Sequence, residues 1–307
     1  MKLNYDRVLI KNNVKKMLKE NWQTVLLVVL LLSAIEIAIE LVAMQNQAGG
    51  EFLSFIVRMP FDVAICSFLM WMMKNREART SDFFEPFSRF LKYILAGVWK
   101  SLWIFLWTLL LIIPGIVKGY AYAMYPYILA ADPDADIVDA LRTSKKMTNG
   151  YKIDLFTLSL TFLGWYFLLF LVAIGVEMLV IGQNPIELMN EGAFDLLLSK
   201  ASVIAKIVTI PLSILLNCYV TGVFSQVYEL LKTRAVADGV CAPEEFGLTG
   251  EQAAVFADEK QIGNMSIRYQ SNIENDSDIY YETIEGEILP ETDEERKNKE
   301  VERGEKE

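Results

Sequence analysis

The residues with the clearest chemical potential are charged side chains inside long apolar runs. Glu36 and Glu40 lie in one such run, and Arg58 and Asp62 lie in the next. The members of each pair are four residues apart and so share a helix face. A charge at the centre of a membrane-spanning helix costs about 2.5–3.5 kcal/mol on insertion scales, so it needs a partner or a function. The four residues are candidates for a polar cavity whose carboxylates receive a cation or proton and whose Arg58 binds an anionic headgroup.

A second interpretation is that these charges hold helices together. Arg58 would then pair with Asp62 or Glu36 across a helix interface. Lysines such as Lys118 and Lys206 would extend their ammonium groups toward the membrane surface. Because structural pairing is the more usual role of such groups, the sequence favours this interpretation over the cavity.

The charged pairs belong to a chain of 307 residues that is 53% hydrophobic. Its mean hydropathy is +0.29, although its last quarter is polar. A helix needs about 20 apolar residues to cross a bilayer, and the runs that approach this length are 22–43, 52–73, 93–113, 116–131, 155–181 and 202–231. We therefore expect an all-α fold: a polytopic transmembrane helical bundle of about six spans, formed by residues 22–231.

The third and fourth runs are joined at Pro114 and Gly115. Proline removes a helix donor and glycine permits a sharp turn, so this pair is expected to form a hairpin turn inside the membrane. The fourth run has about 16 residues, which rise only about 24 Å as a helix. A re-entrant or tilted helix is the alternative to a full crossing, and Pro126 should loosen it.

Basic amphipathic segments alternate with the apolar runs. Residues 1–21 predict an interfacial helix that lies on an anionic leaflet with its apolar residues toward lipid. The segment 132–154 predicts another helix, with Asp136 as its N-cap and Gly150 as its stop. The basic residues expected at the interface are Lys15, Lys16, Arg142, Lys145 and Lys146.

The positive-inside rule places these basic segments, together with 74–92 and the exit from the last span, on one side of the membrane. Both termini are therefore expected in the cytoplasm, with membrane lipids and their anionic headgroups as partners. The predicted location is a plasma membrane crossed several times.

Residues 232–307 form an acidic segment with 9 Lys/Arg and 20 Asp/Glu, a net charge of −11, whereas the whole chain has a net charge of −10. Its composition predicts a largely disordered cytoplasmic tail. Isolated apolar residues within it are a possible docking motif for a protein partner, whereas its negative charge argues against nucleic acid.

Aromatic residues crowd two of the runs. Trp99, Trp103 and Trp107 recur along the third run, and four tyrosines occur between 120 and 127. They are candidates for a surface on which a ligand stacks. Packing and interfacial anchoring are the commoner roles of such residues and are favoured here.

No pattern of catalytic or metal-binding residues is present. The chain has no His, which removes the commonest general base and metal ligand, and no HExxH, GxSxG or Walker sequence occurs. Cys66, Cys218 and Cys241 are scattered, so neither a disulfide framework nor a zinc site is indicated. We expect no enzymatic activity, no metal and no cofactor.

Three stretches carry a family resemblance. The chain reads VKKMLKENWQTVLL from Val14, IIPGIVKGYAYAMYPYILA from Ile112, and ALRTSKKMTNGYKIDLFTLSLTFLGWY from Ala140. In these stretches it resembles the bacterial integral-membrane family known as domain-of-unknown-function family 975, over roughly residues 14–232. The resemblance implies a membrane fold and a bacterial plasma membrane, and it transfers no site because that family has no established activity.

The leading functional hypothesis is a non-enzymatic membrane protein that organises lipid or a partner complex. It rests on the interfacial helices and the solvated tail. The alternative is a transporter, or a carrier of lipid or a small molecule, that uses the buried charges in the outer half of the bundle.

Overall fold

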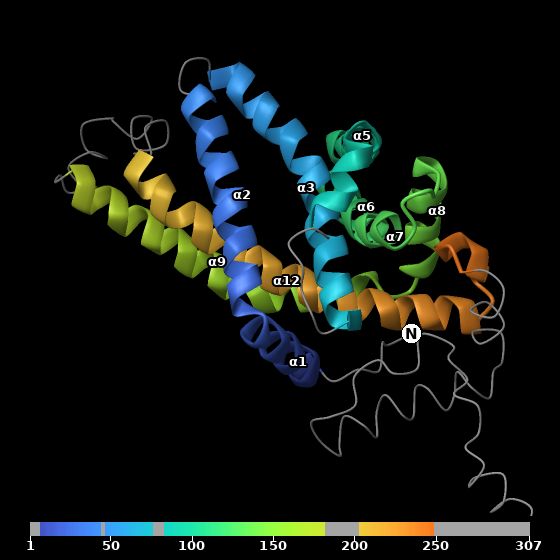
Figure 1. Ribbon diagram of the computed structural model, residues 1–307. Coiled ribbons are helices and arrows are strands. Elements are labelled where there is room, and N and C mark those ends of the chain that lie inside the picture. Colours follow the sequence, from blue (N-terminus) through green and yellow to red (C-terminus); the bar gives the residue numbers. More distant parts are fainter. Residues whose placement is uncertain (1–6, 44–46, 76–82, 182–202, 249–307) are drawn as a thin grey trace, which may run out of the picture. The chain divides into compact units, whose positions relative to one another are not determined.

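A computed structural model of the chain describes residues 7–43, 47–75, 83–181 and 203–248. Within these ranges the regular secondary structure is helical, in agreement with the expected all-α class (Figure 1). The elements in chain order are α1 (Arg7–Glu20), α2 (Trp22–Ala43), α3 (Gln47–Asn75), the 3-10 helix η1 (Glu85–Arg89), α5 (Phe90–Leu110), α6 (Ile112–Ala121), α7 (Tyr125–Ala131), α8 (Ile137–Met147), α9 (Lys152–Ile181), α12 (Val203–Ala237) and the 3-10 helix η2 (Pro243–Phe246).

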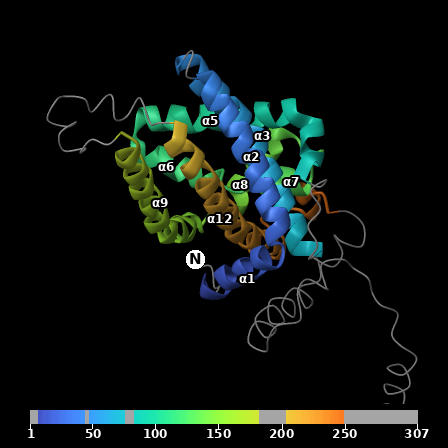
Figure 2. The same cartoon turned by 60° about the vertical axis from the view of Figure 1, so that its left-hand side comes forward.

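Five stretches in the described ranges are long and apolar enough to cross a membrane, and they lie in α2, α3, η1 with α5, α9 and α12. α9 lies beside α12 (Figures 1 and 2). Its large side chains Trp165, Phe167 and Phe170 are 57–59% exposed. Large aromatic groups so exposed on a long apolar helix are typical of a surface in contact with lipid.

α5 and α6 form the predicted hairpin, but the chain reverses before Pro114 and Gly115. Leu111 is extended, with φ −160° and ψ 140°, and separates the two helices. Pro114 lies in the first turn of α6, where its missing N–H removes no helical hydrogen bond. A Cβ atom on Gly115 would lie 2.9 Å from the Cα of Thr108. The expected roles are therefore corrected: proline starts the returning helix, and glycine lets it pack closely on α5.

The predicted fourth span, 116–131, is not a single helix. α6 ends at Ala121, and α7 begins at Tyr125 with Pro126 in its first turn. Proline favours this break because it is well accommodated at a helix start and poorly in a helix interior. α7 is also too buried to face lipid, since Ile128 and Leu129 are fully covered. The described ranges thus contain five long apolar helices where six were expected.

α1 packs its apolar face on other helices. Ile10, Val14 and Met17 are buried, and a Cβ atom on Gly222 of α12 would lie 2.8 Å from Val14 Cγ1. Lys11 of α1 also donates a hydrogen bond to the Thr161 hydroxyl of α9 at 2.7 Å, and Figure 2 shows α1 at the bottom of the view, next to α2 and α12. The expectation that these apolar residues point into lipid is corrected, because the amphipathic pattern serves helix packing equally well.

α8 has the predicted bounds. The Asp136 carboxylate accepts hydrogen bonds from the N–H groups of Val138 and Asp139 at 2.8 and 3.3 Å. Gly150 has a φ of 89°, which explains why the chain can turn there before α9 begins.

The segment after α12 folds back onto α8 (Figure 1). We call residues 238–247 the clasp. The N–H groups of Val240 and Cys241 both donate to the carbonyl of Ala235, at 2.9 and 3.0 Å, and Phe246 is buried. The predicted tail of 232–307 thus includes an ordered beginning, while residues 249–307 lie outside the described ranges.

Candidate functional site

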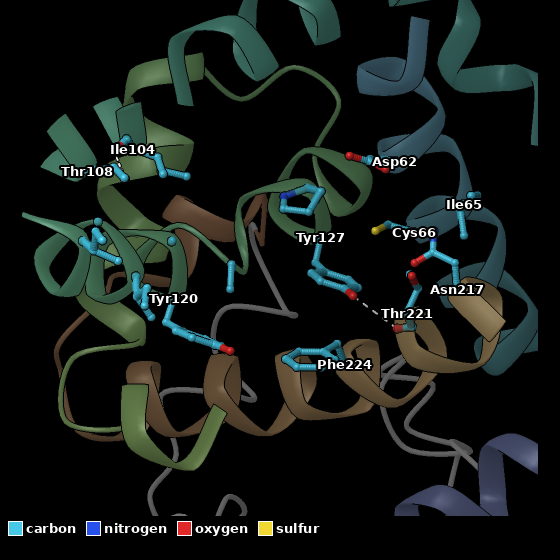
Figure 3. Close-up of a pocket in the computed structure, with 16 residues that line it drawn as sticks. Asp62, Ile65, Cys66, Ile104, Thr108, Tyr120, Tyr127, Asn217, Thr221 and Phe224 are labelled. Carbon is cyan, nitrogen blue, oxygen red and sulfur yellow. Dashed lines mark hydrogen bonds between the residues drawn. The ribbon is translucent and has the colours of Figure 1, made fainter. Parts of the chain in front are cut away.

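A cavity of about 510 Å³ lies among α3, α5, α6, α7 and α12 (Figure 3). This volume falls within the range of about 300–1,000 Å³ that is typical of small-molecule sites. The polar side chains that line it are Asp62, Cys66, Thr108, Tyr120, Tyr127, Asn217 and Thr221. The cavity thus draws on parts of the chain that lie far apart in the sequence.

One wall is polar. Asp62 and Cys66 project from α3 toward the helix that carries Tyr127 (Figure 3). The Tyr127 hydroxyl donates a hydrogen bond to the Thr221 carbonyl at 3.2 Å, and its ring stacks on Tyr228 at 5.7 Å between centroids. These contacts fix Tyr127 from two sides, so this part of the wall is preorganised.

The facing wall, formed mainly by α5 and α6, is mostly apolar, with Thr108 and Tyr120 as its polar groups. Ile104 of α5, Ile112 and Ile116 of α6, and Phe224 of α12 contribute to it. Gly119 also lines the cavity, and a Cβ atom added there would meet nothing within 4 Å. A carboxylate and uncharged hydrogen-bonding groups facing an aliphatic wall suit a molecule with one polar end and one apolar end.

Asp62 is the charged group of this cavity. Its side chain is exposed, and it lines the cavity rather than a packed interface. The positive charges of Lys100 and Arg58 act on it. Lys100 also lies over the Tyr125 ring, with 4.5 Å between its ammonium and the ring centroid, and neither Lys100 nor Arg58 lines the cavity.

The four residues predicted to form a polar cavity do not form one together. Arg58 pairs with Glu36 at 3.4 Å, and Lys206 pairs with Glu40. The space beside these two pairs is about 20 Å³, enough for roughly one water molecule. Glu36, Glu40 and Arg58 therefore sit in ion pairs between helices, whereas Asp62 lines the separate, larger cavity.

The basic residues predicted at the interface differ in what surrounds them. Arg142 pairs with Asp139 at 2.6 Å, and Lys146 pairs with Glu245 of the clasp at 2.9 Å. Lys145 is exposed, as are Lys15 and Lys16 on α1. The bonded residues stabilise the protein's own structure, so fewer basic groups remain to meet lipid.

Sequence reasoning did not bring together Cys66, Asn217 and Thr221, because each is an ordinary polar residue within an apolar helix. A usable signal was the tyrosine cluster between 120 and 127. Tyr120 and Tyr127 line the cavity, whereas Tyr125 is buried beneath Lys100. In the described ranges, no three His, Cys, Asp or Glu side chains come together as metal ligands would.

The model of the protein family described as "Protein of unknown function (DUF975)" matches residues 108–189. The resemblance to this family is confirmed over these residues, which include the stretches from Ile112 and Ala140, whereas the stretch from Val14 lies outside the match. The DUF975 segment begins near the end of α5 and includes α6 to α9, so it supplies Tyr120 and Tyr127 to the cavity. The wall formed by α3 and α12 lies outside it. No curated protein and no solved structure matches the chain.

Proposed function

We propose that this chain is a non-enzymatic, multi-pass protein of a bacterial plasma membrane that binds a small amphipathic molecule and acts as its carrier. The observation that supports this is the cavity of about 510 Å³ with Asp62 on its polar wall. Five candidate spans support the membrane location. The proposal also places both termini in the cytoplasm, as the basic segments favour, and this requires one crossing more than these five.

The proposed ligand is an organic cation. An ionised carboxylate in a largely apolar cavity attracts positive charge more strongly than it would in water. Neutral groups such as Asn217 and Tyr127 can accept further hydrogen bonds from a polar head. The aliphatic side chains of α5 and α6 would cover the apolar part of the molecule.

The test uses two hydrophobic ions of equal shape and opposite charge, tetraphenylphosphonium and tetraphenylborate. Their binding is measured on the protein in lipid nanodiscs, with empty nanodiscs as the blank. We expect saturable binding of the cation that weakens roughly tenfold in Asp62→Asn, since about 1.4 kcal/mol is a modest charge interaction in a partly solvated site. Equal binding by parent and variant would refute the proposal.

The matched control is Glu40→Gln, which removes the same charge from a carboxylate that does not line the cavity. It should leave cation affinity within about twofold of the parent. A second readout uses Cys66, which lines the cavity: the bound cation should slow alkylation of Cys66 by N-ethylmaleimide and leave Cys241, outside the cavity, unaffected.

A second candidate function is the organisation of lipid or of a partner complex. It is favoured by the extensive exposed apolar surface of α9 and by the acidic segment beyond the clasp. Flux measurements in liposomes separate the two candidates when they use an organic cation that does not cross protein-free liposomes, because only a carrier then moves it across the membrane.

A further inference from the structure

Three lysines from three helices come together where α6 meets α8 and α9. They are Lys118, Lys145 and Lys152. The hydroxyls of Ser144 and Thr148 donate hydrogen bonds to the carbonyl of Ala121 at 3.0 and 3.2 Å, which holds the end of α8 against the end of α6, and the charges of Lys145 and Lys152 both act on Lys118. Within the described ranges none of the three forms an ion pair with an acidic residue. Like charges held close together repel one another, so the cluster would be stabilised by a bound anion.

Nearby basic residues are engaged elsewhere, which distinguishes this cluster. Arg142 and Lys146 of the same helix α8 are neutralised by Asp139 and Glu245. Lys145 is exposed between them. Of the basic residues on α8, therefore, it is Lys145 that contributes an unneutralised charge to the cluster.

The position of the cluster is fixed by contacts between α6 and α9. The hydroxyls of Tyr120 and Ser159 are hydrogen-bonded at 2.5 Å, and the Tyr120 ring meets Phe156 edge-on with 5.7 Å between centroids. Lys118 additionally lies over the Trp107 ring, with 4.6 Å between its ammonium and the ring centroid. Tryptophan and lysine together are typical of the level at which lipid headgroups lie.

Apolar surface continues from the cluster along both helices. Exposed side chains on α6 and α9 are Ile116, Val117, Ile153, Phe156, Leu160 and Leu163. A free phosphate ion would use only the lysines. A phospholipid would use the lysines through its headgroup and this surface through its acyl chains, so the charge and the apolar flank together favour lipid.

We propose that Lys118, Lys145 and Lys152 bind the phosphate of an anionic phospholipid whose acyl chains lie along α6 and α9. This site is separate from the cavity, and it does not depend on the proposed carrier function. It gives the predicted preference for anionic headgroups a specific location.

The experiment compares lipids retained on the full chain by native mass spectrometry. The protein is equilibrated with equal amounts of dioleoyl phosphatidylglycerol and dioleoyl phosphatidylcholine, which share acyl chains and differ in headgroup. The variant Lys118→Gln/Lys145→Gln/Lys152→Gln should lower the ratio of bound phosphatidylglycerol to phosphatidylcholine by roughly tenfold or more, because each basic residue near an anionic lipid contributes roughly fivefold. An unchanged ratio overturns the proposal.

The matched control for the single change Lys145→Gln is Arg142→Gln. It removes an exposed positive charge from the same helix, at a residue already paired with Asp139, and should keep the ratio within about twofold of the parent. An equal fall in this control would mean that total charge, not the cluster, selects the lipid, and would overturn the proposal.

A single substitution and a competing anion separate loss of the lysine cluster from misfolding and from binding of free phosphate. The single exposed change Lys145→Gln should lower the ratio, and Lys145→Arg should restore it, so a folding defect in the triple variant does not decide the outcome. Excess inorganic phosphate should leave phosphatidylglycerol bound. Its displacement by phosphate would assign the lysines to a free anion and overturn the lipid site.

Discussion

Replacing Glu245 by alanine should open the clasp. The Glu245 carboxylate accepts hydrogen bonds from Lys146 at 2.9 Å on both oxygens, from Thr143 at 2.8 Å and from the N–H of Ala242 at 3.2 Å. Among the described residues of the clasp, no other side chain makes as many hydrogen bonds with α8. Its removal therefore tests whether these bonds hold the clasp closed.

The expected magnitude follows from the burial of the partners. Thr143 is 2% exposed, and a buried hydroxyl without an acceptor costs about 1–3 kcal/mol. The Lys146 side chain is 40% exposed, so its ion pair contributes at most about 1 kcal/mol. Together these give about 2 kcal/mol, which raises the open population about 30-fold.

Cys241 reports the opening directly. It is 3% exposed, and burial together with the nearby charge of Glu245 raises the pKa of its thiol to about 11. Alkylation by N-ethylmaleimide therefore proceeds from the open state, at a rate proportional to its population. Peptide mass spectrometry assigns the label, with Cys66 and Cys218 as internal references.

The control is Glu244→Ala, which removes an exposed carboxylate from the neighbouring position. Cys241 in Glu245→Ala should react about 30-fold faster than in the parent, and in Glu244→Ala within about twofold. Equal rates in Glu245→Ala and the parent would show that the apolar packing of Phe246 closes the clasp without these bonds.

Two further predictions follow from charge and from packing. Burial alone would raise the pKa of Glu245, but hydrogen bonds from Lys146 and Thr143 hold it below the ordinary value of 4.5. The ionised Glu245 therefore stabilises the closed clasp above pH 4.5, and this stabilisation is lost as the pH falls through the lowered pKa. Hydrogen exchange of the Cys241 amide, corrected for its intrinsic rate, should accelerate in that pH range. An exchange rate that does not change with pH would contradict this prediction. In the hairpin, Gly115→Ala should lower the thermal midpoint of unfolding because overpacking against the α5 backbone costs about 1–3 kcal/mol. Gly119→Ala should not lower it, because the space around Gly119 is open. Equal effects of the two substitutions would refute the inference that Gly115 lets α6 pack closely on α5.

Local patterns in the sequence predicted the elements well. The lengths of the apolar runs predicted α2 with its observed bounds, and they predicted α3, α5, α9 and α12 with bounds close to those observed. This works because a long helix satisfies all its backbone hydrogen bonds within itself. Asp136 and Gly150 predicted where α8 begins and where the chain turns after it, because helix caps depend on the residue types at those positions. The hairpin of α5 and α6 was predicted as well, although its turn was not placed correctly.

The errors arise where one pattern suits two environments. The basic amphipathic sequence of α1 fits a membrane surface and a helix interface equally, and only the position of Gly222 shows that α12 covers it. The run 116–131 is apolar throughout, but apolarity does not distinguish lipid from a packed interior. α7 is buried by protein, so its short length needs no thinning of the membrane.

The class of the protein and the positions of its charges inside apolar helices can be predicted from the sequence alone, because both follow from hydrophobic length and from the energy of burying charge. Which charge meets which partner was decided by the tertiary structure. Glu36 and Asp62 are equivalent in sequence terms, but one is paired with Arg58 and the other lines a cavity. Helix crossings set these distances, and no local pattern encodes a crossing between segments far apart in the chain.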